Sequence, residues 1–164
     1  MKNFFLLFLF LSTPLFAQVG VSVFAKQHDS RSNFEERPYG KDDLSYGLFI
    51  EAFEGVGGWR LGAAYSDDVS GLPGVDTVIT PELSLIVVDR IWETGLSILV
   101  DYVEANGESG WGDLYYQTQL GINLPFGDSF QVGAHAYYPM ESISDIVDIG
   151  FNDLDFAVQI RMLF

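Results

Sequence analysis

The sequence of 164 residues contains no cysteine, which excludes disulfide bonds, a cysteine nucleophile and thiolate ligands for a metal. Cations are scarce as well: 8 Lys and Arg stand against 23 Asp and Glu, so the formal net charge is −15. Proteins bind nucleic acids largely through Lys and Arg contacts to phosphate, so we expect no nucleic-acid partner. Because no phosphate-binding loop or zinc-binding helix motif occurs, we also expect no cofactor and no metal.

Long apolar runs are missing too. No segment is continuously apolar for about 18 residues, the length that suggests a helix crossing a bilayer. The run from Phe4 to Leu11 is shorter, with an early lysine before it and Pro14 and Ala17 after it, which is the layout of a secretory signal. We therefore predict a signal peptide over residues 1–17, cleaved after Ala17, and a mature chain of residues 18–164.

The sequence is rich in apolar side chains, at 48%, and it places them in alternation. The clearest case is the segment 154–164 (LDFAVQIRMLF), in which every second residue is large and apolar. A β-strand points successive side chains to opposite faces, so this segment has one apolar face and one largely polar face. Its length fits the roughly 9 to 11 residues that a tilted strand needs to cross a membrane.

The same alternation recurs along the chain, and no helical period persists. The predicted strands cover residues 19–26, 44–53, 59–66, 78–88, 94–103, 113–124, 130–138 and 154–164. The long connections are 27–43, 67–77, 104–112 and 139–153, and short turns lie between them. An even strand number with alternating connection lengths is typical of a membrane barrel that has turns at one rim and loops at the other. We therefore predict an all-β fold, an eight-stranded antiparallel transmembrane up-and-down β-barrel.

Aromatic residues fall near strand ends on the apolar face, where membrane barrels carry two girdles of interfacial rings. The predicted girdle residues are Trp59, Trp92, Phe130 and Phe164 toward the turn rim, and Tyr46, Tyr65, Tyr102, Tyr116 and Tyr138 toward the loop rim.

This pattern, over essentially the whole mature chain, resembles the small eight-stranded bacterial outer-membrane barrels, the class of the OmpA membrane domain, OmpX and the opacity proteins. The alternating segment that ends on Phe164 resembles the carboxy-terminal strand by which such barrels are recognised and inserted. The resemblance implies a location in the bacterial outer membrane. It also implies contact with outer-membrane lipid and lipopolysaccharide, and with the barrel-assembly machinery. We expect a monomer.

Side chains just fill the bore of an eight-stranded barrel, so the polar inner face predicts a packed plug rather than a pore. Buried charges must be paired. Counting across the turns places Glu51 opposite or diagonal to Arg60, and Lys26 near the level of Asp155 across the closing seam. The predicted lumen network consists of Lys26, Glu51, Arg60, Glu82, Asp101, His135, Asp155 and Arg161.

One predicted pairing joins two carboxylates. Aligning Val88 with Gly95 places Glu82 opposite Asp101. Two facing carboxylates need a cation, a shared proton or a basic partner, for which Lys26 and His135 are the nearest candidates by height. Such a pair could carry out acid–base chemistry, but a plug network explains it more simply.

Outward loops rich in carboxylates suggest a structural or surface-interaction role. The acidic loop residues are Asp67, Asp68, Asp76, Glu104, Glu108, Glu141, Asp145, Asp148 and Asp153. They could share divalent cations with lipid phosphates, or they could simply keep the loops solvated.

Two other functions stay open: a narrow conduit for small hydrophobic molecules, and a lipid A-modifying enzyme. The lipid A palmitoyltransferase barrels use a His of the first outer loop with Asp and Ser of the second. His28, Asp67, Asp68 and Ser70 are the residues of those types here. The lipid A deacylase barrels use a His and a Ser two positions apart. Here His135 is followed by Ala136 and then Tyr137, so the serine nucleophile is missing. We expect no enzymatic activity.

Overall fold

The computed structural model describes residues 18–29, 37–67, 69–148 and 153–164. The predicted signal peptide and Asp68 lie outside this part of the chain. The strands are β1 (Gln18–His28), β2 (Asp43–Glu54), β3 (Gly57–Asp67), β4 (Val75–Asp89), β5 (Trp92–Ala105), β6 (Glu108–Pro125), β7 (Phe130–Met140) and β8 (Asp155–Leu163). A short 3-10 helix, η1 (Ile143–Asp148), lies between β7 and β8. No helix in these ranges is long and apolar enough to cross a bilayer.

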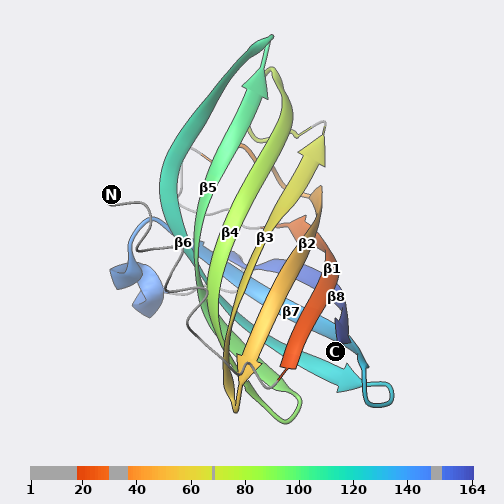
Figure 1. Ribbon diagram of the computed structural model, residues 1–164. Helices are drawn as coiled ribbons and strands as arrows, with labels where there is room; N and C mark the ends of the chain where they lie inside the picture. Colours follow the sequence, from red (N-terminus) through yellow and green to blue (C-terminus); the bar gives the residue numbers. More distant parts are fainter. Residues whose placement is uncertain (1–17, 30–36, 68, 149–152) are drawn as a thin grey trace, which may run out of the picture.

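The strands form one closed barrel in chain order, β1 to β8, and every neighbouring pair is antiparallel (Figure 1). The barrel closes where β1 pairs with β8, from Gly20 opposite Leu163 to Gln27 opposite Phe156. At the turn rim the backbone N–H of Phe164 donates to the Val19 carbonyl over 2.8 Å. The predicted fold, an eight-stranded antiparallel up-and-down barrel, is confirmed.

The alternation of apolar and polar residues in the sequence corresponds to side chains that point alternately out of the barrel and into it. In β8, the outward Phe156, Val158 and Ile160 are exposed, whereas the inward Asp155 and Arg161 are buried. Side chains of adjacent residues point to opposite faces of a sheet, so one alternating pattern separates apolar from polar groups along the whole strand. The barrel is therefore polar inside and apolar outside, the reverse of a soluble core.

Aromatic rings fill part of the interior against glycines of the next strand. Phe24 is opposite Gly47, Phe49 is opposite Gly62, and the two rings stack with centroids 4.6 Å apart. A Cβ on Gly62 would overlap the Leu48 carbonyl oxygen and the Phe49 ring. Glycine lets the ring lie close to the neighbouring backbone, which a side chain would prevent.

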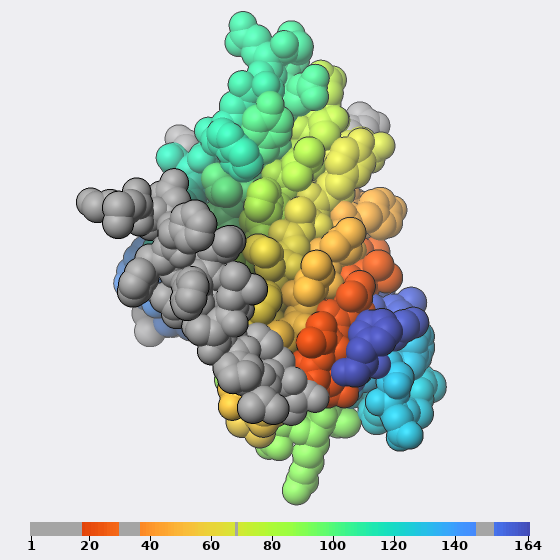
Figure 2. Space-filling model, in the orientation of Figure 1, coloured from red at the N-terminus to blue at the C-terminus, as the bar shows by residue number. Residues whose placement is uncertain are grey.

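The predicted long loop over residues 104–112 is wrong. In the structure, β5 and β6 continue through this stretch and meet in a two-residue turn, with Ala105 paired to Glu108. Asn106 and Gly107 have φ angles of 52° and 80°, as a type I′ hairpin turn requires. Asn and Gly are the residues that favour this turn, so the sequence did contain the signal. We call residues 102–115 the projecting hairpin; it stands beyond the neighbouring strands at one end of the barrel (Figures 1 and 2).

The predicted register of β4 against β5 is also wrong. Gly95 pairs with Ile86 rather than Val88, and Glu82 pairs with Leu99, so Glu82 and Asp101 are not opposite each other. The turn between the strands is tighter than expected: Asp89 already pairs with Trp92, and Arg90 takes a φ of 58°. A tighter turn shifts every cross-strand pair of the hairpin together.

Candidate functional site

The interior near the turn rim is organised around two arginines. Arg161 of β8 donates to Glu51 of β2 through Nε over 2.6 Å and through Nη2 over 3.0 Å. The same Nη2 reaches Glu93 of β5 over 2.7 Å. All three side chains are buried, and together they tie β2, β5 and β8 across the barrel.

Arg60 of β3 is opposite Glu51, as the sequence indicated, but its ion pairs lie elsewhere. Its guanidinium is 3.3 Å from Glu93 and 3.5 Å from Glu82, and it also bonds Gln119. The guanidinium carbon lies 4.4 Å from the centroid of the Phe49 ring, a cation–π geometry. Glu93 is thus shared by both arginines and is the central carboxylate of this end of the lumen.

A second network lies toward the loop rim around Asp155. Its carboxylate accepts from Arg37 over 3.1 Å and lies 3.1 Å from His28 Nδ1. The other ring nitrogen of His28 is 3.0 Å from the Ser45 hydroxyl. The His28 ring stacks on Tyr39 at 3.8 Å between centroids. Arg37 and Tyr39 belong to the first long connection, so this connection contributes to the lumen.

Charge and burial keep Arg37 and Tyr39 in defined protonation states. Burial opposes the charge of Arg37, but Asp155, Tyr115 and Asp101 together more than offset it and raise the pKa of the guanidinium above its usual range. Burial also raises the pKa of the Tyr39 hydroxyl, and the Asp101 carboxylate adds to that effect. Arg37 is therefore a permanent cation, and Tyr39 stays neutral, 2.6 Å from Thr80.

The sequence predicts that Lys26 pairs with Asp155, whereas in the structure the hydrogen bond of Lys26 goes to a different residue. Its ammonium donates to Gln117 over 3.2 Å and lies 5.3 Å from the centroid of the Tyr137 ring. Asp101 instead receives hydrogen bonds from Thr80 and, over 3.2 Å, from Tyr115. His135 points inward, 3.2 Å from Asn123 and 3.8 Å from Glu93. All eight residues predicted for the lumen are thus buried in it, although most of their partners differ from the predicted ones.

Sequence reasoning missed Glu93, Arg37, Tyr39 and the glutamines. Glu93 lies two residues before Gly95 and therefore points to the same inward face, so extending the predicted strand by one residue would have found it. No comparable signal marks Arg37, because a loop residue has no periodicity.

Of the residues named for the enzymatic alternative, those that the structure describes, His28, Asp67 and Ser70, are not hydrogen-bonded to one another. His28 is 2% exposed and both ring nitrogens have protein partners. Ser70 donates its hydroxyl to Asp43 over 2.8 Å. Asp67 is the last residue of β3, and Asp68 lies outside the described residues. Within the described ranges, no group of three or more His, Asp or Glu side chains has the arrangement of a metal site.

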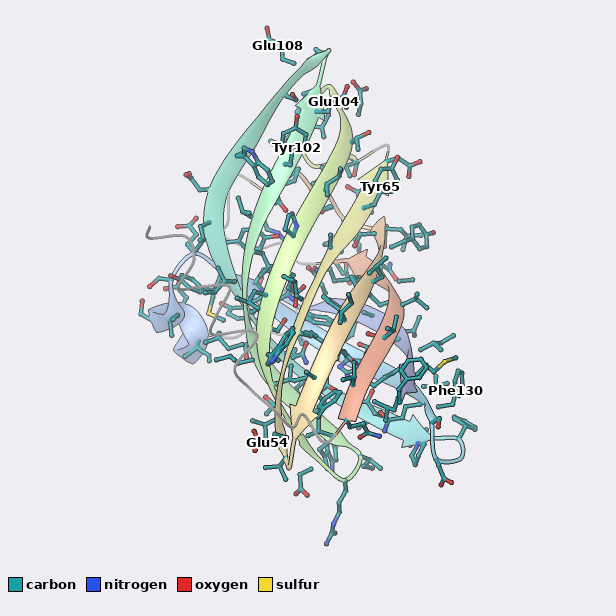
Figure 3. The ribbon with its side chains drawn as sticks, viewed as in Figure 1. Glu54, Tyr65, Tyr102, Glu104, Glu108 and Phe130 are labelled. Atoms are coloured by element: carbon teal, nitrogen blue, oxygen red, sulfur yellow. The ribbon has the colours of Figure 1, made fainter. Side chains whose placement is uncertain are left out.

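The aromatic residues predicted for the girdles lie mainly on the outer wall. Tyr46, Tyr65 and Trp92 are exposed, and Tyr65 and Tyr102 lie toward one end while Phe130 lies toward the other (Figure 3). Tyr116 is an exception, because β6 extends beyond it toward the loop rim. Trp111 and Phe126, which the sequence analysis did not single out, are also exposed.

The outer wall carries an apolar hollow of about 610 Å³ across β6, β7, β8 and β1. Its floor includes the small side chains of Ala25, Ala134 and Ala136, and the flanking residues include Leu120 and Phe156. It opens on the apolar face, so it adds no polar site to the barrel.

Comparison with known proteins supports the fold. No protein-family model and no curated protein matches this sequence. Among solved structures, the chain is similar to Neisserial surface protein A, with a TM-score of 0.53 and 8% identity. The match covers 89% of this chain and 94% of that one. At so low an identity the likeness concerns the barrel fold alone.

Proposed function

We propose that this protein is a small bacterial outer-membrane barrel with a plugged polar lumen, acting in a structural or surface-interaction role through its acidic outer rim. The observation that carries this proposal is the apolar outer wall. Exposed large apolar side chains occur on all eight strands, among them Val21, Val23, Leu48, Ile50, Leu61, Leu83, Leu85, Val87, Ile98, Leu120, Val132, Val158 and Ile160. A continuous belt of this kind is not stable in water, because soluble proteins rarely expose large apolar patches.

The hydrocarbon core of a bilayer would cover this apolar belt. A closed barrel has no free strand edge there, so its backbone N–H and C=O groups form hydrogen bonds between neighbouring strands. Aromatic residues near both ends of the wall match the preference of Tyr and Trp for membrane interfaces. The similar fold of Neisserial surface protein A, whose name describes a surface protein rather than an enzyme, supports the same assignment.

The interior supports a plug. Arg161, Arg60, Glu51 and Glu93 bridge strands that lie on different sides of the barrel. Because charge-assisted hydrogen bonds are short and strong in a dry interior, these side chains hold one another in place and leave the bore filled.

The rim formed by the long connections is acidic. Among the exposed side chains of the described residues, the only Lys and Arg are Lys41 and Arg90, and Arg90 lies in a turn at the opposite rim. Among the described residues of the loop rim, Lys41 lies 3.7 Å from Asp29, and Glu104 and Glu108 form no salt bridge. A surface of one sign favours partners of the opposite sign.

Two experiments test this proposal. The purified mature chain should need detergent to stay in solution and should migrate differently on gels before and after boiling. Protease added to whole cells should cut in the long connections. A chain that is soluble without detergent, with migration unaffected by heat, would refute the barrel in a membrane.

The enzymatic alternative has its own test. Expression of the protein should leave the mass spectrum of lipid A unchanged. A mass change that disappears in a His28→Ala variant would replace the proposed role by lipid A modification.

A further inference from the structure

The projecting hairpin leaves one strand edge open. β6 pairs with β5 along its whole outer part, up to Ala105 opposite Glu108. Its pairing with β7, in contrast, ends at Tyr116 opposite Met140. In the part of the chain that the structure describes, residues 108–114 therefore pair with no strand on the side where β7 lies farther along β6. We call this stretch the open edge.

The backbone groups that face the open edge can be assigned. Phe126 donates its N–H to Phe130, on the β7 side, while Asn123 donates to Ile91, on the β5 side. The inward residue Asn123 of β6 thus directs its N–H toward β5, and successive residues of a strand alternate in this direction. Residues of β6 with outward side chains therefore direct N–H and C=O toward β7. Beyond the bulge near Val100, Trp111 and Ser109 are the outward residues, since Trp111 contacts the Tyr102 ring and Ser109 accepts from the Tyr102 hydroxyl. The N–H and C=O groups of Ser109 and Trp111 thus face the open edge.

The surroundings of this edge are anionic and hollow. Glu104 and Glu108 lie at its tip (Figure 3), Asp113 lies within it, and no Lys or Arg occurs between Arg90 and Arg161. A hollow of about 650 Å³, lined by residues that include Leu72, Val103 and Trp111, lies against the hairpin. Trp111 is 64% exposed. An exposed aromatic face next to carboxylates attracts cations from two sources, the charges and the ring.

We propose that the open edge binds an extended cationic peptide segment of another protein by strand addition. The added strand forms main-chain hydrogen bonds with Ser109 and Trp111. Its alternate side chains separate by face: lysines on the outward face meet Glu104 and the Trp111 ring, and small apolar groups on the other face enter the hollow. Glu108 lines that hollow and adds to the negative charge at the tip. This inference names the partner class of the surface-interaction role and rests on that proposed function for its biological setting.

The test uses the full mature chain in micelles of a zwitterionic detergent, so that binding does not depend on orientation in a membrane. The probe is a fluorescent peptide of about ten residues that alternates lysine and valine, the period of a strand. A matched peptide has the same side chains with every backbone nitrogen methylated. The methylated peptide keeps the charge but cannot complete a β-ladder, and we expect its affinity to fall at least about tenfold.

Protein variants separate edge from charge. Glu104→Gln with Glu108→Gln should weaken the unmodified peptide by about two- to tenfold. Glu54→Gln with Asp89→Asn removes the same charge at the opposite rim (Glu54 is labelled in Figure 3) and should leave affinity unchanged. Equal binding of the two peptides, an equal effect of the two double variants, or no binding would each overturn the inference.

A second copy of this chain is the competing occupant. If Ser109→Cys forms disulfide-linked dimers when a mild oxidant is added, and peptide present beforehand does not suppress their formation, the edge is a self-association site and the inference is wrong. Binding of the unmodified peptide in micelles, together with an open edge that proteases cannot reach on whole cells, would refute the proposed outward orientation and leave the peptide site standing.

Discussion

Arg161 divides its guanidinium between two carboxylates, and this sharing makes the lumen sensitive to single substitutions. Glu51→Ala would leave the buried Arg161 with Glu93 as its remaining carboxylate. Removing one partner of a buried ion pair is strongly destabilising, and we expect the free energy of unfolding to fall by about 3 kcal/mol. Urea titration in lipid vesicles, followed by tryptophan fluorescence, measures this loss.

The control for Glu51→Ala is Glu54→Ala, an exposed acid on the same strand, which should change stability by less than about 0.5 kcal/mol. In a double-mutant cycle, Glu51→Ala and Arg161→Ala should show a coupling of about 1–3 kcal/mol. Additive losses would mean that the two side chains do not stabilise the barrel as a pair.

At Gly62, adding a single methyl group is expected to destabilise the barrel. Gly62→Ala would drive a methyl group into the Leu48 carbonyl and the Phe49 ring, and we expect a loss of about 1–3 kcal/mol in the same titration. Gly57→Ala is the matched change on β3, where the nearest atom to a new Cβ is 3.9 Å away. If both variants unfold alike, the close ring–backbone packing is not a source of stability.

The stability of the projecting hairpin depends on its two-residue turn. Gly107→Ala should strain the turn by about 1–2 kcal/mol because Gly107 has a φ of 80°. Hydrogen exchange of the amides in residues 102–111 should therefore accelerate. Gly110→Ala makes the same chemical change without a positive φ and with open space around the new Cβ, so it should leave the exchange rates unchanged.

The closing strand β8 carries the expected signal for the barrel-assembly machinery. Phe164→Ser should lower the fraction of protein in the outer membrane that shows heat-modifiable migration, because the terminal aromatic of this strand is lost. Phe126→Ser removes another exposed aromatic, in the β6–β7 turn, and should leave the assembled fraction unchanged. Equal assembly of both variants would remove Phe164 from the recognition signal.

For the whole molecule, the proposed plug predicts that the barrel does not conduct ions. Reconstituted in planar bilayers, the protein should give no conductance steps, since Arg60, Arg161 and their carboxylates occupy the interior. Regular steps would contradict the plug and favour the conduit.

The number of strands, and the face of the side chains within the predicted strands, can be predicted from the sequence alone. Both follow from alternation, a local property: neighbouring residues of a strand point to opposite faces whatever the rest of the chain does. Residues that point into the lumen can therefore be predicted from their alternate positions in a strand, without knowledge of which strands pair. The Asn106–Gly107 turn is equally local, because Asn and Gly at these two positions favour a type I′ turn; the hairpin found in place of the predicted loop follows from these two neighbouring residues.

Only the tertiary structure decided the partners. Arg161 meets Glu51 and Glu93 because closure brings β8 within reach of β2, two strands away, and of β5, farther around the barrel. The turn length after Asp89 sets the height of Glu82 relative to Asp101. Arg37 contacts Asp155 from the connection between β1 and β2, where no alternation of apolar and polar residues predicts the direction of a side chain. Contacts between residues far apart in the chain depend on register, closure and side-chain reach together, so parity alone assigns residues to the lumen but cannot pair them.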